Sequence, residues 1–152
     1  MNSKQIQLFI LTCAIGLIYF IYQLPTSVIE NKNSKEEMQK AISVEQALTL
    51  IEGVNPMEGV FMLRDIVENN PQDTEALYYL GVLSNQTGQY ENAAKRFNQL
   101  ITIDSSDKRA YLQLGISNYQ LGNKDIADSL FNIVRNSNDN LLLKELEFFL
   151  TN

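Results

Sequence analysis

The stretch from Tyr78 to Phe97 reads YYLGVLSNQTGQYENAAKRF, and much of it returns between Tyr111 and Phe131 as YLQLGISNYQLGNKDIADSLF. Each copy is typical of two helices around a glycine turn, because the left-handed conformation that ends many helices is cheap for glycine. The identical residues lie 34 positions apart: Leu80 and Leu114, Gly81 and Gly115, Gly88 and Gly122, Ala93 and Ala127, and Phe97 and Phe131. A fixed period of this length predicts a repeat array whose unit is a pair of helices.

The residue types suit the packing of such pairs. We expect Gly81 and Gly115 where the two helices cross most closely, because a side chain there would push the helices apart. The other packing positions are small residues on the facing helix, leucines in the space between the paired helices, and phenylalanines that fill the gap to the next pair: Ala93 and Ala127, Leu80 and Leu114, and Phe97 and Phe131.

The spacing L-x2-L-G from Leu77, followed by A-x3-F from Ala93, resembles the tetratricopeptide repeat (TPR) family. The spacing Y-x2-L-G from Tyr111, followed by A-x3-F from Ala127, repeats the pattern. The large aromatic of the family motif is replaced by Leu77 in one copy and by Tyr111 in the other. The resemblance implies a fold of stacked helix pairs over residues 41–150.

A third, less regular copy lies upstream, over residues 41–73. Its first helix has one apolar face, formed by Val44, Ala47, Leu48 and Ile51. We expect Gly53 to end this helix and Asn55 to cap the next one, with Pro56 in its first turn and Glu58 close to a capping box. The spacing from Gly59 to Leu63 takes the place of the Ala-x3-Phe element.

We therefore predict an all-α TPR helix-turn-helix solenoid with three repeats, at about 41–73, 74–107 and 108–139. A capping helix at 141–150 follows, because the last pair of a solenoid leaves one face unburied. Its inward residues are expected to be Leu142, Leu143 and Leu146, with Phe149 or Leu150.

The solenoid is expected to lie behind one N-terminal transmembrane helix. Residues Ile6 to Leu24 carry no charge over 19 positions, near the length that spans a hydrocarbon core. We predict a membrane anchor at 1–24, with the lipid bilayer as its partner through 6–24, and a polar tether at 25–40. The alternatives are a cleaved signal peptide, a lipoprotein acylated at Cys13, and a buried core helix.

The orientation in the membrane stays open on charge alone, since Lys4 precedes the segment and three lysines follow it: Lys32, Lys35 and Lys40. A short polar head is easily left in the cytoplasm. The run NPMEGVFMLRDIVENNPQDTEALYYLG from Asn55 is similar to small membrane-anchored TPR proteins of the Bacteroidetes kind. We therefore expect a single-pass protein of a bacterial inner membrane, with the TPR domain in the periplasm.

The TPR resemblance implies a concave groove, lined by the first helix of each pair, that binds a peptide or a partner helix. The candidate groove residues form an apolar and aromatic stripe: Tyr78, Val82 and Asn85, and their 34-residue counterparts Leu112, Ile116 and Tyr119. Such a stripe favours a hydrophobic or amphipathic partner segment. We predict a membrane-anchored, non-catalytic scaffold for a protein or peptide partner.

Three alternatives remain open. The capping helix could fold back over the groove, or the groove could bury another copy in a homo-oligomer, which would make the chain a self-associating structural membrane protein. The chain could also be an accessory subunit of a periplasmic assembly system, such as cytochrome c maturation or secretion. The basic and polar clamp with which some TPR domains hold chaperone tails is missing, since the first helix offers Val44, Glu45, Leu48 and Thr49 instead.

The composition argues against other classes of function. The chain has 12 Lys and Arg against 18 Asp and Glu, a net charge of −6, and no basic block that would favour nucleic acid. It has no histidine and one cysteine, which removes zinc sites, Cys-His pairs and Ser-His-Asp triads. Asp125 and Asp128 are better explained by a helix N-terminus, and DSSD at 104–107 by a loop and cap. We expect no enzyme activity, no cofactor and no metal.

Overall fold

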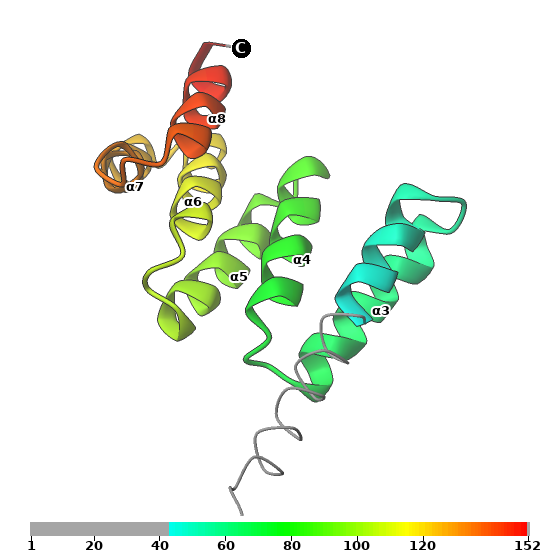
Figure 1. Cartoon of the computed structure of the whole chain (residues 1–152). Helices are drawn as coiled ribbons and strands as arrows, with labels where there is room; N and C mark the ends of the chain where they lie inside the picture. Colours follow the sequence, from blue (N-terminus) through cyan, green and yellow to red (C-terminus); the bar gives the residue numbers. More distant parts are fainter. Residues whose placement is uncertain (1–42, 152) are drawn as a thin grey trace, which may run out of the picture. The chain divides into compact units, whose positions relative to one another are not determined.

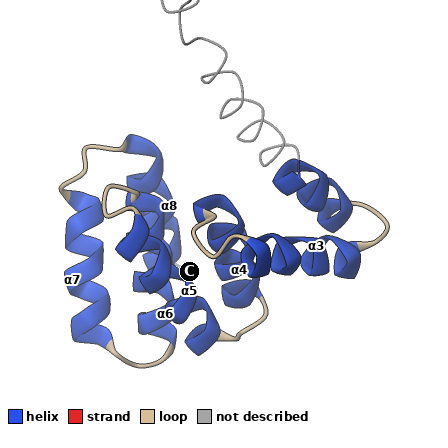
Figure 2. Ribbon diagram, turned by 90° about the horizontal axis from the view of Figure 1, so that it is seen from below, coloured by secondary structure: helices blue, strands red, loops and turns tan. Residues whose placement is uncertain are grey.

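The computed structural model describes residues 43–151, which form seven helices and no strand (Figures 1 and 2). The chain divides into two units, residues 1–40 and 41–152, and all the described residues belong to the second. The predicted anchor at 6–24 and the tether lie outside the described residues. Within residues 43–151, every helix is too short or too polar to cross a bilayer.

The helices follow one another in pairs (Figure 1). Residues 43–52 pair with α3 (Pro56–Asn69). The next two pairs are α4 (Thr74–Gln86) with α5 (Tyr90–Ile103), and α6 (Lys108–Gln120) with α7 (Lys124–Arg135). The last helix is α8 (Asn140–Thr151), which packs on both α6 and α7. The predicted all-α array of helix pairs is therefore confirmed for this part of the chain.

Three helices of the array begin in the same way. Asp73 accepts a hydrogen bond from the Ala76 amide at 3.1 Å and so caps α4. Asp107 caps α6 through the Arg109 amide at 3.0 Å, and Asp139 caps α8 through the Leu141 amide at 2.9 Å. Each cap is preceded three residues earlier by an Asn or Asp: Asn70, Asp104 and Asn136. The helix α8 is therefore encoded at its start like the first helix of a repeat.

The glycine turns between paired helices have the predicted conformation. Gly88 follows α4 with a φ of +74°, and Gly122 follows α6 with a φ of +82°. These values lie in the left-handed region that side chains other than hydrogen rarely adopt. The prediction that these glycines end the first helix of each pair is confirmed.

Phenylalanine rings pack on glycine backbone inside the second and third pairs. A Cβ atom added to Gly81 would lie 2.5 Å from Cζ of Phe97, and one added to Gly115 would lie 2.7 Å from Cδ1 of Phe131. Both rings are fully buried. The glycines therefore stand where the paired helices approach most closely, and the ring of the second helix fills the space that a side chain would take.

The core consists of three clusters, each of which joins one helix pair to the helix that packs beside it. The central cluster contains Leu77, Ala93, Phe97, Leu100, Ala110 and Leu114. The C-terminal cluster joins α6, α7 and α8 through Leu112, Ala127, Phe131, Val134, Leu142 and Leu146. The N-terminal cluster contains Val44, Ala47, Leu63, Ala76 and Leu80. The inward positions expected for α8 at Leu142 and Leu146 are confirmed, and Phe149 packs beside them half-buried.

Three details differ from the sequence-based expectations. Phe97 and Phe131, expected to fill the gap to the next pair, place their rings on Gly81 and Gly115 of their own pairs, because a glycine leaves room for a ring there. Leu80 and Leu114 pack against the preceding helix pair rather than between their own two helices, because the interior of each pair is already filled by a phenylalanine ring. Asn55 stands at the start of α3, but its side chain does not cap the helix. Its amide group instead donates a hydrogen bond to Glu58 Oε2 at 3.2 Å.

Candidate functional site

A cleft of about 450 Å³ lies between α4, α6 and α8. It is lined by four of the six predicted groove residues: Tyr78, Val82, Asn85 and Ile116. The other lining residues were not predicted: Tyr79, Gln86, Gln113 and Glu145. The structure therefore brings the predicted stripe of α4 together with one residue of the α6 stripe, and it adds a residue from α8.

The prediction for Leu112 was wrong. Its side chain is fully buried and packs in the C-terminal cluster with Phe131, Leu142 and Leu146. The physical reason is α8, which covers this part of α6. The capping helix thus covers Leu112 but leaves Ile116 half-buried at the cleft, so it closes only part of the expected groove.

Tyr119 lies in a second cleft of about 550 Å³, which α6 and α8 line together. Its ring meets the ring of Phe149 edge to face, with centroids 5.4 Å apart, and it is 39% exposed. The lining also includes Ile116 and Glu145, which belong to the first cleft as well. The remaining lining residues are Gln120, Phe148, Phe149 and Leu150. The two clefts share two residues and form one groove, defined here as the α4/α6/α8 groove.

The groove contains two rows of side chains at equivalent repeat positions. Aligning the caps Asp73, Asp107 and Asp139 places Phe148 at the position of Val82 and Ile116. All three line the groove, which gives an apolar row across three helices. The same alignment gives a polar row of Tyr79, Gln113 and Glu145, and these three line the first cleft. Sequence reasoning missed Phe148 and Glu145, although the shared cap pattern before α8 carried the signal.

Asn85 has a structural role in addition to its place in the groove. Its Nδ2 group donates to both the backbone oxygen and Oε1 of Gln113, each at 3.1 Å. Its Oδ1 accepts from the hydroxyl of Ser117 at 2.8 Å. Gln113 in turn donates to Glu145 Oε1 at 2.9 Å. This network links α4, α6 and α8 and fixes the floor of the groove.

One end of the groove has a cluster of charges around Tyr78. The guanidinium of Arg109 lies 4.6 Å from the centre of the Tyr78 ring and forms ion pairs with Glu75 and Asp107. Hydrogen bonds to Asp107 and then to Glu75 raise the pKa of Arg109 above its ordinary value. Burial, assisted by the negative charge of Glu145, raises the pKa of the Tyr78 phenol to about 12. The phenol therefore keeps its proton to a higher pH than an ordinary tyrosine does.

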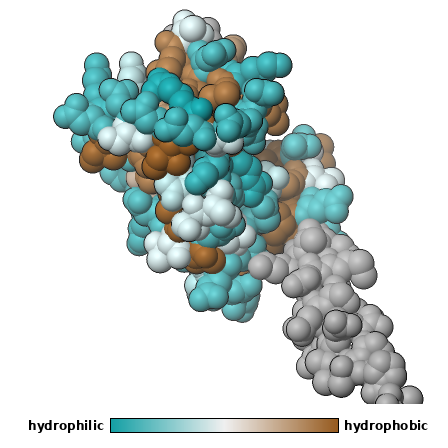
Figure 3. All heavy atoms as spheres, turned by 60° about the vertical axis from the view of Figure 1, so that its left-hand side comes forward, coloured by the Kyte–Doolittle hydropathy of each residue, from teal (hydrophilic) through white to brown (hydrophobic). Residues whose placement is uncertain are grey.

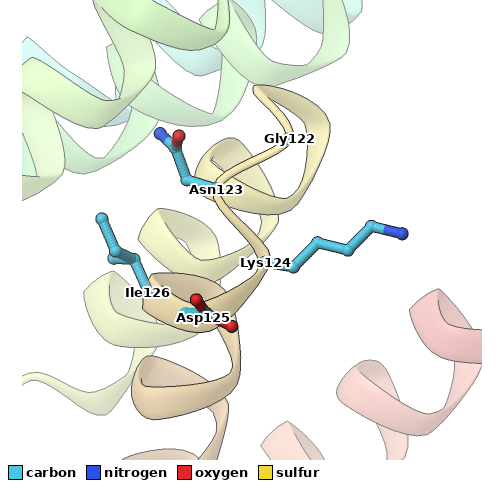
Figure 4. A pocket seen from close by; sticks show the side chains of 5 residues that line it. All are labelled: Gly122, Asn123, Lys124, Asp125 and Ile126. Atoms are coloured by element: carbon cyan, nitrogen blue, oxygen red, sulfur yellow. The ribbon is translucent and has the colours of Figure 1, made fainter.

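The other candidate sites do not bring several side chains together around one point. A shallow pocket of about 380 Å³ lies at the turn between α6 and α7, and its lining is five consecutive residues, 122–126 (Figure 4). Lys124 points away from Asn123 and Ile126 there, so the side chains do not converge on one point. Asp125 lies in the first turn of α7, as expected. Within residues 43–151, no group of three or more Asp, Glu, Cys or His side chains could hold a metal ion.

Two family models match part of the repeat region. A family model described as TPR repeat matches residues 83–122, and one described as Tetratricopeptide repeat matches residues 109–140. No curated protein matches the chain. The two family models and the solved structures described next support the TPR repeat family for this chain.

Solved structures agree with that result. The second TPR of Spaghetti (RPAP3), bound to the HSP90 peptide SRMEEVD, matches with a TM-score of 0.58 and 15% identity, covering 66% of this chain and 94% of that one. The MamA protein matches with a TM-score of 0.54 and 21% identity. The match covers 78% of this chain and 67% of the MamA chain. At these identities the likeness establishes the fold, an all-α TPR solenoid.

Proposed function

We propose that this chain is a non-catalytic adaptor that binds a hydrophobic or amphipathic segment of a partner protein in the α4/α6/α8 groove. The observation that carries the proposal is the apolar row of Val82, Ile116 and Phe148, which runs across three helices and reaches solvent. Phe148 is 71% exposed. An exposed apolar row beside polar side chains is typical of a protein interaction site.

Two comparisons support this proposal. TPR proteins are generally non-catalytic adaptors. The TPR of Spaghetti (RPAP3), which has the same fold, is bound to a peptide. The partner of the present chain is proposed to be a protein or peptide, and no nucleic acid is expected on a chain with a net charge of −6.

Site-specific photocrosslinking in the native cell tests the proposal. A photoreactive amino acid replaces Ile116 in the groove, and a matched variant carries it at Glu91, which is exposed on α5 outside both clefts. We expect position 116, but not position 91, to crosslink to one partner protein. The purified partner should bind the unmodified chain and lose binding to Ile116→Glu. Equal crosslinking from both positions would contradict the proposal that the partner binds in the groove.

Membrane anchoring is a second part of the proposal. It is supported by the uncharged stretch at 6–24, whose length suits a membrane-spanning helix. We propose that this segment holds the TPR domain at a bacterial inner membrane, on the periplasmic side. Resistance of the protein to alkaline extraction from membranes tests the anchor. Protease access to residues 43–151 in spheroplasts tests whether the domain lies on the periplasmic side. Alkaline release of the protein would refute the anchor.

Self-association is the one competing function that a specific observation favours. The helix α8 exposes Leu141 at 75% in addition to Phe148. On the face drawn in Figure 3, apolar residues reach the surface in patches among hydrophilic ones. Analytical ultracentrifugation separates the two functions. A dimer that dissociates in Phe148→Ser would favour self-association, and a monomer at all concentrations would exclude it.

A further inference from the structure

The charge in the groove is negative and comes from a single residue, Glu145. Among the residues that line either cleft, Glu145 is the only charged one, and it belongs to both. It is exposed on α8, and within the described residues its one hydrogen bond is the one that Oε1 accepts from Gln113 at 2.9 Å. The second carboxylate oxygen, Oε2, has no hydrogen-bond partner within residues 43–151. A carboxylate oxygen without a partner can accept a charge-assisted hydrogen bond from a Lys or Arg side chain of a ligand.

Within residues 43–151, Glu145 forms no ion pair with a Lys or Arg side chain. Arg109 lies against the Tyr78 ring, but its guanidinium is held by Glu75 at 2.6 Å and by Asp107 at 2.7 Å. Lys124 lies at the opposite end, 5.8 Å from the centre of the Tyr119 ring. The middle of the groove therefore keeps an unbalanced negative charge.

Apolar and aromatic side chains line the groove together with Glu145. Ile116 lies beside it in both clefts, and Phe148 and Phe149 follow on α8. A Lys or Arg side chain suits such a place, because its aliphatic stem packs on apolar surface while its charged end reaches the carboxylate. The aromatic rings add a favourable interaction with the cation.

We infer that the α4/α6/α8 groove takes a partner segment that is both basic and amphipathic, with a Lys or Arg at Glu145 and apolar side chains along the row of Val82, Ile116 and Phe148. This inference rests on the proposed function and specifies its partner chemistry. The segment differs in charge from the SRMEEVD peptide of the Spaghetti (RPAP3) structure, which contains three acidic residues.

Selection of short random peptides on the full 152-residue chain, held by an N-terminal tag, provides the test. We expect the selected peptides to share a Lys or Arg among apolar residues. Synthetic copies with that basic residue changed to Glu should bind about fivefold more weakly, and added salt should reduce the difference. Glu145→Lys should reverse the preference, whereas Glu145→Gln should abolish it.

Glu147→Lys is the matched control. It makes the same change of charge two positions away on α8, at an exposed residue that lines neither cleft. We expect it to leave the preference for basic peptides in place. A loss of preference as large as that of Glu145→Lys would show that the net charge of the helix matters rather than the site, and would overturn the inference.

The outcomes separate the inference from the proposed function. Peptides that lose binding to Ile116→Glu but bind Glu145→Lys unchanged would overturn the charge inference and leave the groove intact. If the peptides bind Ile116→Glu and the unmodified chain equally tightly, or if no peptide is selected, both the charge inference and the proposed function are overturned. A homodimer that Ile116→Glu dissociates would make a second copy the occupant and would also overturn both.

Discussion

Arg109 and Glu75 occupy the same position of two successive repeats, 34 residues apart, and their side chains form an ion pair with Nη2 2.6 Å from Oε1. The repeat unit therefore places opposite charges face to face when α6 stacks beside α4. The same guanidinium contacts Asp107, whose side chain is only 8% exposed, and covers the ring of Tyr78. One residue thus joins the stacking of the repeats to the electrostatics of the groove.

The Arg109–Glu75 pair should contribute a small, salt-dependent coupling. Both side chains are more than a third exposed, so solvent screens the interaction. A double-mutant cycle with Arg109→Met and Glu75→Gln in urea unfolding should give a coupling free energy of about 0.5 kcal/mol that falls at high salt. A coupling that grows with salt would contradict the electrostatic origin. Arg109→Met alone should cost more than Glu75→Gln, because it leaves the nearly buried Asp107 carboxylate without its cation.

Gly81→Ala should destabilise the second repeat. The added methyl group would lie 2.5 Å from Cζ of Phe97, whose ring is fully buried. Overpacking costs about 1–3 kcal/mol, part of which the better helix propensity of alanine offsets. In urea unfolding, Gly81→Ala combined with Phe97→Leu should be less destabilised than the sum of the two single variants. If the losses of unfolding free energy of the two single variants add up in the double variant, the contact with the Phe97 ring is not the cause of the destabilisation.

Gly88→Ala is the control for that experiment. Nothing lies within 4 Å of its added Cβ, but its φ of +74° disfavours any side chain. We expect a cost of about 1 kcal/mol from the backbone alone. Phe97→Leu should not relieve this cost.

Leu112→Ala and Ile116→Ala should separate packing from binding on α6. Leu112 is fully buried in the C-terminal cluster, so its truncation should cost about 2–4 kcal/mol of unfolding free energy. Ile116 is only half-buried, so its truncation should cost about 1 kcal/mol and act mainly on partner binding. Urea unfolding and peptide binding, measured on both variants, check this. Equal stability losses would refute the assignment of Leu112 to the core.

The stability of the domain should fall between about pH 10 and pH 12 through Tyr78, because burial raises the pKa of this phenol to about 12 in the folded chain. The unfolded phenol loses its proton near pH 10, so in this window the folded state binds more protons than the unfolded state. The free energy of unfolding must then decrease as the pH rises. Tyr78→Phe should remove this part of the pH dependence.

Urea unfolding of both chains across this pH range measures the difference. The unmodified chain should lose stability faster than Tyr78→Phe above about pH 10. Parallel curves for the two chains would show that the pKa of Tyr78 is not raised by folding.

The sequence was most informative where the physics is local. Short motifs predict the 34-residue period, the glycine turns at Gly88 and Gly122, and the close helix crossings at Gly81 and Gly115, and the structure contains them. A positive φ at glycine and a close helix crossing each depend on a few neighbouring residues. Such features can be predicted without knowledge of the rest of the fold.

The groove was harder to predict because it depends on how α8 docks. Leu112 has the repeat position of the half-buried Tyr78, yet it is fully buried because α8 packs over it. Glu145 and Phe148 enter the groove from the same helix, whose sequence lacks the repeat motif beyond its cap. The polar role of Asn85 also escaped prediction, since its partner Gln113 lies 28 residues away with no motif to mark it.

The common start of α4, α6 and α8 has one more consequence, which concerns Glu147. Aligning the three caps places Glu147 at the position that Gly81 and Gly115 hold in the complete pairs. A further helix packed on α8 in the same register would press an aromatic ring onto a carboxylate instead of a bare backbone, and would strip that carboxylate of water. Glu147 is exposed, as such a residue must be. A single charge in place of a glycine thus opposes the stacking of another helix on α8 in this register.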